Sequence, residues 1–194
     1  MEAADRVFLR RGTHGARMAE IAAEAGVNKA LLHYYYRGKE KLAEAVFLRM
    51  LRRLLPAVVE TMASDLGLEE KAARTIESYV EQLSRHPYLP GYVIGEVTHH
   101  PDRLPQLVAG IAGGRFEQAI AKLEAQIAAR VAAGTLAPTS ARQFLANVLS
   151  LAIFPFAVRP MLQAVFGLDG DGFAGFVAER RGELAGFVAR GLRP

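Results

Sequence analysis

One stretch of the sequence decides the fold: residues Gly12–Phe47 read GTHGARMAEIAAEAGVNKALLHYYYRGKEKLAEAVF. Apolar residues at helical spacing predict a short helix over Arg17–Ala25, and Asn28, a favourable N-cap residue, precedes a second one over Lys29–Tyr36. Gly26 lies between them and can adopt the positive φ that a tight corner needs. Two short helices joined in this way predict a helix-turn-helix unit, whose second helix can enter the major groove of DNA.

The packing of such a unit assigns roles to the residues around the corner. Two helices that cross steeply need a small contact residue on the first, which Ala22 supplies. We expect Val27 to plug the corner and Leu31 or Leu32 to point inward from the second helix. The remaining side chains of the second helix are basic, polar and aromatic, which suits phosphates and base edges.

The ordered set of these residues resembles the TetR family of transcriptional regulators. The matching residues are Ile21-Ala22, Ala25–Lys29, Leu32–Tyr36, Lys39-Glu40 and Leu42. The resemblance implies an all-α protein with an N-terminal three-helix DNA-binding domain and a C-terminal helical bundle for ligand binding and dimerisation. The chain departs from the family pattern at Thr13, where an aromatic is usual, at Ala16-Arg17, where Thr or Ser is usual, and at His33, where Tyr is usual. Arg17 can replace the phosphate contact of the missing hydroxyl but not its helix cap.

Composition bounds the class of protein. About half of the 194 residues are apolar, which is enough for a substantial core, and the absence of Cys excludes disulfides and thiolate metal sites. That usage fits a reducing cytoplasm, where we expect the protein to act. The chain begins directly in an amphipathic pattern, so we expect no secretory signal, although a native start upstream of Met1 stays open. The longest apolar run, Phe144–Val158, is shorter than the ~18–20 residues that span a bilayer, so we expect a buried helix and no membrane partner.

The net charge of +4 is concentrated at one end of the chain. Residues 1–54 contain 11 Lys and Arg and 6 Asp and Glu, whereas residues 55–194 contain 13 and 14. The basic excess therefore coincides with the helix-turn-helix, as a phosphate-binding module requires.

Helical patterns continue to the end of the chain, without a convincing strand. Besides the helix-turn-helix, we expect helices over 1–11, 39–55, 69–85, 91–99, 104–133, 141–165 and 173–192. Pro56 should end or kink the helix over 39–55, and Gly113-Gly114 is a weak point in the helix over 104–133. Pro155 and Pro160 should bend or split the helix over 141–165. The predicted domains are a DNA-binding domain over 1–38 with a connecting helix over 39–55, and an effector-binding and dimerisation domain over 56–194. Small residues are frequent in the last two helices, through which the family resemblance implies a homodimer.

Seven residues are the predicted DNA contacts: Arg17, Lys29, Ala30, His33, Tyr34, Tyr35 and Lys39. Lys29 and Ala30 begin the second helix of the unit, whose first turn points into the groove, while Tyr34 and Tyr35 can donate to phosphate or pack on thymine methyl groups. His33 either contacts a base edge or is an ordinary surface histidine. We expect Tyr36 to be core.

Six further residues are candidates for the lining of an effector pocket: Tyr79, Tyr92, Arg115, Phe116, Phe154 and Arg159. The aromatic side chains suit an apolar small molecule, and either arginine can anchor an acidic group or extend to solvent. Plain core packing is the alternative for each aromatic. His99-His100, with His86 and Glu96, suggest a metal site, because Glu96 and His100 are four residues apart; Pro101 follows at once, however, and a histidine at a helix end is the favoured interpretation. The sequence offers no catalytic or cofactor-binding motif.

These observations predict a ligand-responsive transcriptional repressor that binds a palindromic operator as a dimer and responds to an unidentified small-molecule effector. Two other classes stay open. One is a helical carrier of an apolar small molecule without specific DNA binding, and the other is a small helical metalloenzyme that uses the histidines.

Overall fold

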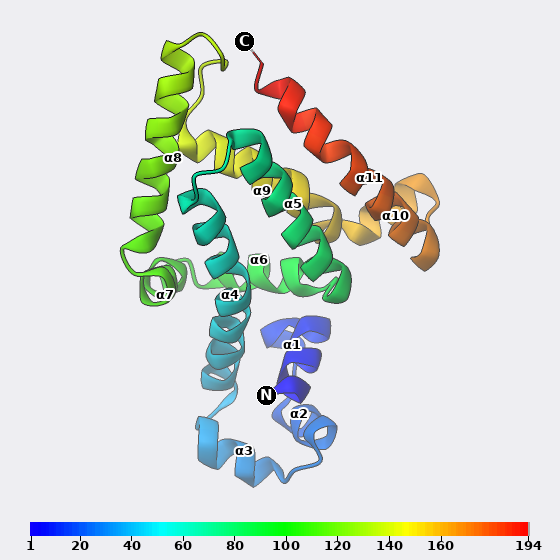
Figure 1. Cartoon of the computed structure of the whole chain (residues 1–194). Coiled ribbons are helices and arrows are strands. Elements are labelled where there is room, and N and C mark those ends of the chain that lie inside the picture. Colours follow the sequence, from blue (N-terminus) through cyan, green and yellow to red (C-terminus); the bar gives the residue numbers. More distant parts are fainter. Residues whose placement is uncertain (194) are drawn as a thin grey trace. The chain divides into compact units, whose positions relative to one another are not determined.

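A computed structural model describes residues 1–193, apart from the side chain of Arg103, and every regular element in that range is a helix (Figure 1). This confirms the all-α prediction. The chain forms two compact units, one of Met1–Arg53 with Tyr88–Ile111, and one of Leu54–Pro87 with the described residues from Ala112 onward. The helices are α1 (Glu2–Gly15), α2 (Met18–Ala25), α3 (Lys29–Tyr36), α4 (Lys39–Ala63), α5 (Leu68–Arg85), α6 (Leu89–His99), α7 (Arg103–Ala112), α8 (Arg115–Ala132), α9 (Ala141–Ala157), α10 (Arg159–Phe166) and α11 (Gly170–Gly191).

The first unit packs α1 against α2 and α6, and α2 against α3. Its core contains Val7, Phe8, Ile21, Leu42 and Phe47, all nearly inaccessible to solvent. Ion pairs tie the surface of α1 to its neighbours: Arg6 lies 2.8 Å from Glu24 of α2, and Arg49 of α4 lies 3.6 Å from Asp5. These contacts join α1 to α2, the first helix of the helix-turn-helix, and to α4.

Helix α6 joins the first unit, although the sequence placed it in the second domain. Tyr92 is buried between the rings of Phe8 and Phe47, with centroids 6.3 and 6.2 Å away, and its hydroxyl donates to the carbonyl of Ala43. The buried carboxylate of Glu96 accepts a hydrogen bond from the hydroxyl of Thr13. Thr13, one of the departures from the family pattern, therefore fixes α6 to the end of α1.

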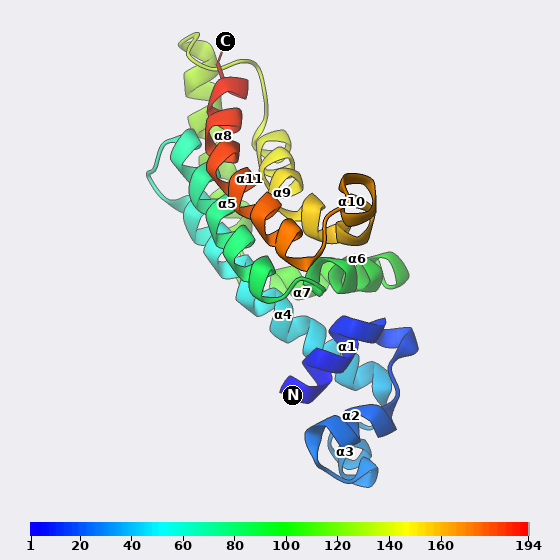
Figure 2. The same ribbon diagram turned by 90° about the vertical axis from the view of Figure 1, so that its right-hand side faces the viewer.

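The second unit is built around α5, which packs against both α9 and α11 (Figure 2). The apolar stripe of α5 includes Leu68, Ala72, Ile76 and Leu83, all buried. Helix α8 packs beside α9, and the carboxylate of Glu124 on α8 accepts the N–H of Ala141 at the start of α9.

Several helix boundaries differ from the sequence prediction; for example, the helix predicted over 1–11 continues to Gly15 through a break at Gly12. Helix α4 continues through Pro56 to Ala63. Pro56 has no N–H to donate to the carbonyl of Arg52, but Arg52 lies on an exposed face, where water can donate to that carbonyl instead. The predicted helix over 104–133 is two helices, divided at the expected weak point, where Gly113 has a φ of 53°. The predicted helix over 141–165 divides at Val158 with a 69° bend, and Pro160 lies in the first turn of α10, where its missing N–H costs little.

No single helix among the described residues has both the length and the apolar character needed to cross a membrane. Helices α9 and α10, which are joined at a bend, have the length and apolar composition of a membrane span only when the two are counted together.

A buried lysine joins three segments of the second unit. Lys71 of α5 is inaccessible to solvent, and its ammonium donates to the carbonyl of Met62 near the end of α4 and to Oε1 of Gln126 on α8, both at 2.9 Å. Gln126 in turn donates to the carbonyl of Leu66. Burial lowers the pKa of Lys71, because desolvation penalises the ammonium form.

Replacing Lys71 by Ala removes the donor to Met62 and leaves a cavity in the second unit. We expect Lys71→Ala to lower the free energy of unfolding by about 2–4 kcal/mol, from the lost packing and the unsatisfied carbonyl together. Urea denaturation followed by circular dichroism measures this. Lys41→Ala, at an exposed lysine of α4, is the control and should change stability by no more than about 0.5 kcal/mol. Equal stability of the two variants would show that the buried contacts of Lys71 do not stabilise the second unit.

Candidate nucleic-acid interface

The turn between α2 and α3 is built on the backbone of Gly26. Its φ of 66° and ψ of 29° are left-handed, a conformation that disfavours residues with a Cβ. The N–H of Gly26 donates to the carbonyl of Ala23 at 3.1 Å, and the N–H of Val27 donates to that of Ala22 at 3.0 Å. This pair of bonds closes the end of α2 and turns the chain toward α3.

Helix α3 begins at the residue that the sequence indicated. Asn28 is its N-cap, and its Oδ1 accepts the N–H of Ala30 at 2.8 Å. The inward contacts come from the half-buried Leu32 and Tyr36. Val27, the expected plug of the corner, is 36% exposed and is therefore covered only in part. Leu31 is 45% exposed, so of the two candidates Leu32 is the inward one.

The remaining side chains of α3 form one exposed face. Lys29, Ala30 and His33 are exposed, and Tyr34 and Tyr35 are exposed by 78% and 68%. The rings of Tyr34 and Tyr35 lie edge to face with centroids 5.3 Å apart. Five of the seven residues predicted to contact DNA therefore share the surface of one short helix.

The other two predicted contacts flank α3 in the chain. Arg17 is exposed at the N-cap of α2 and makes no side-chain cap bond, as its lack of a hydroxyl acceptor implies. Lys39 begins α4 after a corner in which Arg37 has a φ of 55°, and its ammonium donates to the carbonyl of His14 at 3.3 Å. That bond was not predicted, and it places the Lys39 charge beside the end of α1.

Ion pairing leaves the face of α3 without a competing negative charge. Helix α3 has no carboxylate, and the two carboxylates of α2 are each paired with α1: Glu20 with Arg11, and Glu24 with Arg6 and Arg10. The hydrogen bond from Arg6 lowers the pKa of Glu24. A polyanion that approaches α3 therefore meets no unpaired carboxylate on α2 or α3, although Glu40 is exposed in the first turn of α4.

The residues predicted to line an effector pocket are dispersed. Tyr92 fills the core of the first unit, as described above. Tyr79 is buried in the second unit, where burial raises its pKa to about 12. Phe154 is 51% exposed, Arg115 is exposed, and the guanidinium of Arg159 stacks on the ring of Phe173 at 4.7 Å. These residues lie in different places because of packing between residues distant in the sequence, which helical periodicity does not reveal.

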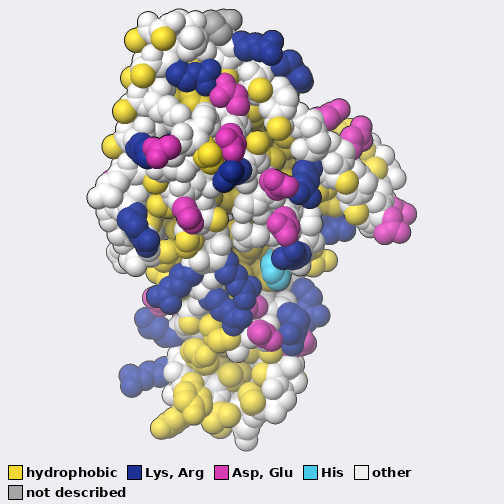
Figure 3. Space-filling model, in the orientation of Figure 1, with side chains coloured by type: hydrophobic (Ala, Val, Ile, Leu, Met, Phe, Trp, Pro, Cys, Tyr) yellow, Lys and Arg dark blue, Asp and Glu magenta, His cyan; other side chains and the backbone are white. Residues whose placement is uncertain are grey.

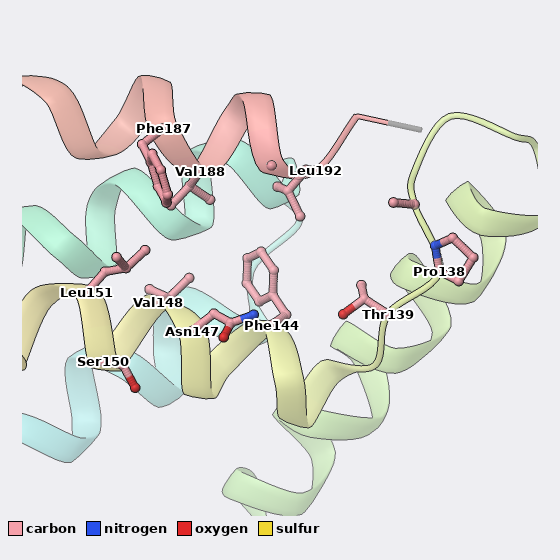
Figure 4. A pocket seen from close by; sticks show the side chains of 12 residues that line it. Pro138, Thr139, Phe144, Asn147, Val148, Ser150, Leu151, Phe187, Val188 and Leu192 are labelled. Atoms are coloured by element: carbon pink, nitrogen blue, oxygen red, sulfur yellow. The ribbon is translucent and has the colours of Figure 1, made fainter.

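Described residues of the second unit line a hollow and a groove. One, of about 480 Å³, lies between α9 and α11; in Figure 4 Phe144 and Val148 of α9 point toward α11, which contributes Phe187 and Val188, and Leu192 follows at its C-cap. The other, a groove of about 800 Å³, lies between α8 and α9. It has an apolar lining of Phe116, Ile120, Leu145 and Leu149 with Glu117, Glu124 and Arg142 among its polar groups. Phe116 is the one predicted pocket residue that lines either hollow.

The histidines do not form a metal centre. The ring of His99 lies 4.7 Å from that of His14, and its Nδ1 is 2.7 Å from the carbonyl of Gly95. Within the described part of the chain, no three His, Asp or Glu side chains converge as metal ligands.

Residues 1–46 match the family model described as bacterial regulatory proteins, tetR family. The chain is 44% identical over 75 residues to the HTH-type transcriptional regulator BetI of Brucella abortus, a segment covering 39% of this chain and 34% of that protein. It is 34% identical over 80 residues to an HTH-type transcriptional regulator of Mycobacterium tuberculosis, covering 41% of this chain and again 34% of that protein. The chain thus covers about a third of the length of these curated relatives.

Solved structures share the fold over most of the chain. SCO4942 from Streptomyces coelicolor superposes with a TM-score of 0.67 at 24% identity, covering 100% of this chain and 96% of that one. The TetR family transcriptional regulator PfmR from Thermus thermophilus superposes with a TM-score of 0.61 at 17% identity, covering 80% of this chain and 82% of that one. These structures show the fold, and the match of residues 1–46 to the family model confirms the resemblance identified from the helix-turn-helix residues.

The turn gives a direct test of what holds α3 in place. We expect Gly26→Ala to destabilise the first unit by about 1–2 kcal/mol, because a Cβ disfavours the left-handed backbone although no atom lies within 4 Å of it. Thermal unfolding monitored by circular dichroism measures the change. The matched control is Gly110→Ala in α7, a helical glycine with open space around it, which should gain about 0.5–1 kcal/mol. Stabilisation by both substitutions would show that the turn does not require glycine.

Proposed function

We propose that this chain, a member of the TetR family through its N-terminal domain, is a transcriptional regulator that binds duplex DNA with α3. One observation carries the proposal: the turn at Gly26 presents the side chains of α3 from Lys29 to Tyr35 as an exposed face without carboxylates. An α-helix fits the major groove of B-DNA, and the two short helices at a tight turn have the form that places the second helix there.

The surroundings of α3 favour phosphate contacts on both sides of the groove. Arg17 precedes α2, and Lys39 and Lys41 lie in the first turn of α4, where free backbone N–H groups also attract an anion. Tyr34 and Tyr35 carry hydroxyls that can donate to phosphate oxygens. We assign the seven predicted residues to the DNA interface on these grounds.

We also propose that the protein acts as a homodimer through its last two long helices, α9 and α11. Helix α11 exposes a stripe of small residues, Gly175, Ala178, Gly182 and Ala185, and no atom of the chain lies within 4 Å of a Cβ placed at either glycine. Phe187, on the same helix, is 56% exposed. A two-fold dimer contacts two half-sites, so a palindromic operator follows from the symmetry.

Effector control completes the proposal. The groove between α8 and α9 combines an apolar lining with Arg142 and two glutamates, the composition of a small-molecule site. A ligand that binds one arrangement of the dimer more tightly shifts the population toward it, and repression is relieved when that arrangement no longer matches the operator. A carrier of an apolar molecule would use the same groove but would not bind DNA specifically.

DNA binding across a salt series separates the regulator from the carrier. We expect the full chain to shift a duplex from the region upstream of its own gene, with an affinity that falls steeply between about 50 and 200 mM salt. Tyr35→Ala should weaken that binding without lowering thermal stability, because the side chain is 68% exposed. Tyr88→Ala, at a tyrosine of the same unit that is 58% exposed, is the control and should bind like the wild type. Absence of any specific shift would favour the carrier.

The dimer interface can be tested at a position that the fold does not use. Gly182→Glu places bulk and charge on the exposed stripe of α11, so we expect monomers in size-exclusion chromatography with light scattering, and weakened DNA binding. The control Gly110→Glu makes the same change on α7, also with open space around the Cβ, and should remain dimeric. A dimer of undiminished stability in Gly182→Glu would place the interface elsewhere.

A further inference from the structure

The exposed face of α3 has two chemically different edges. A helix turns by about 100° per residue, so Lys29 and His33 lie along one edge, Ala30 and Tyr34 along the middle, and Leu31 and Tyr35 along the other. Leu32 and Tyr36, the half-buried pair, lie on the opposite side. A helix that enters a groove with its middle line foremost therefore presents a polar edge to one side and an apolar edge to the other.

The apolar part of this face is extensive for a surface helix. Tyr34 is 78% exposed and Leu31 45%, and Val27, two residues before the helix begins, is 36% exposed. Figure 3 shows hydrophobic side chains gathered on the part of the surface that α3 forms. Contiguous exposed apolar surface on a soluble protein marks a place that binds something.

The hydrogen-bonding groups on α3 restrict which bases it can recognise. Bidentate recognition of adenine uses Asn or Gln, but α3 contains neither, and Oδ1 of the preceding Asn28 is occupied by the N–H of Ala30. Cytosine recognition uses a carboxylate, which α3 lacks. Lys29 can donate to the O6 and N7 acceptors of guanine. His33 can contact a base edge, and the base feature that suits the apolar surfaces of Ala30, Leu31 and Tyr34 is the C5-methyl group of thymine.

We propose that α3 recognises its half-site chiefly through thymine methyl groups, which Ala30, Leu31 and Tyr34 contact, while Lys29 contacts a guanine along the polar edge. This inference rests on the proposed function and specifies the DNA sequence class that the same surface selects. The operator half-site is then rich in thymine on the strand that faces Leu31 and contains a guanine toward Lys29.

Deoxyuridine gives a direct test, because it pairs with adenine as thymine does and lacks only the C5-methyl group. Binding sites are first selected by the full wild-type chain from a random duplex pool. The selected duplex is then compared, by fluorescence anisotropy, with duplexes in which single half-site thymines are replaced by deoxyuridine. Burial of one methyl is worth about 0.8 kcal/mol, so we expect about fourfold weaker binding at each contacted position.

Variants assign the methyl contacts to α3. Leu31→Ala should bind thymine and deoxyuridine duplexes equally at the position that Leu31 contacts, and Lys29→Ala should lose the preference for the half-site guanine. Val165→Ala, at a side chain of α10 that is 68% exposed, is the control and should keep the thymine preference. Enrichment of no sequence would overturn both the proposed function and this inference. An enriched site that binds equally well with thymine and deoxyuridine at every position, or whose thymine preference survives Leu31→Ala at every half-site position, would overturn this inference alone.

Discussion

The left-handed backbone at Gly26 is the constraint on which the DNA-binding surface depends. With this backbone, the N–H groups of Gly26 and Val27 both donate to carbonyls in the last turn of α2 and end that helix. Asn28 then caps the beginning of α3. With two caps so close together, neither short helix can lengthen into the other. The outward direction of α3 is therefore set by backbone geometry, and its side chains remain free for recognition.

Features that depend on neighbours in the chain could be predicted from the sequence. The bounds of α3, the N-cap at Asn28 and the weak point at Gly113 follow from local rules of helix capping and glycine conformation. The exposure of Lys29, Tyr34 and Tyr35 follows from the same periodicity, because Leu32 and Tyr36 occupy the inward side. The part of the candidate site that lies on one helix was thus predictable.

Features that depend on distant residues were not predictable in the same way. Nothing in the sequence of α6 indicates that Tyr92 packs on Phe8 and Phe47. An aromatic residue that follows two prolines can be buried in the core of either unit, so its neighbours in the sequence do not identify its partners. The same limit explains the effector pocket, whose predicted residues were chosen for their chemistry and are dispersed by packing. Pro56 is a different case: the usual rule predicts a break, but a helix continues where the carbonyl without a donor lies at an exposed surface.

The distribution of charge and apolar surface in the first unit separates affinity from specificity. Most of its cations lie outside α3, and on α3 itself Lys29 is the one lysine or arginine, beside a mainly apolar face. Phosphate contacts by the surrounding cations contribute a term that salt weakens and base sequence leaves unchanged. Desolvation of Leu31 and Tyr34 contributes binding free energy that salt changes little. This contribution depends on which base groups line the major groove of the DNA. For such a surface, raising the salt concentration should weaken binding to all duplexes while preserving the discrimination among them.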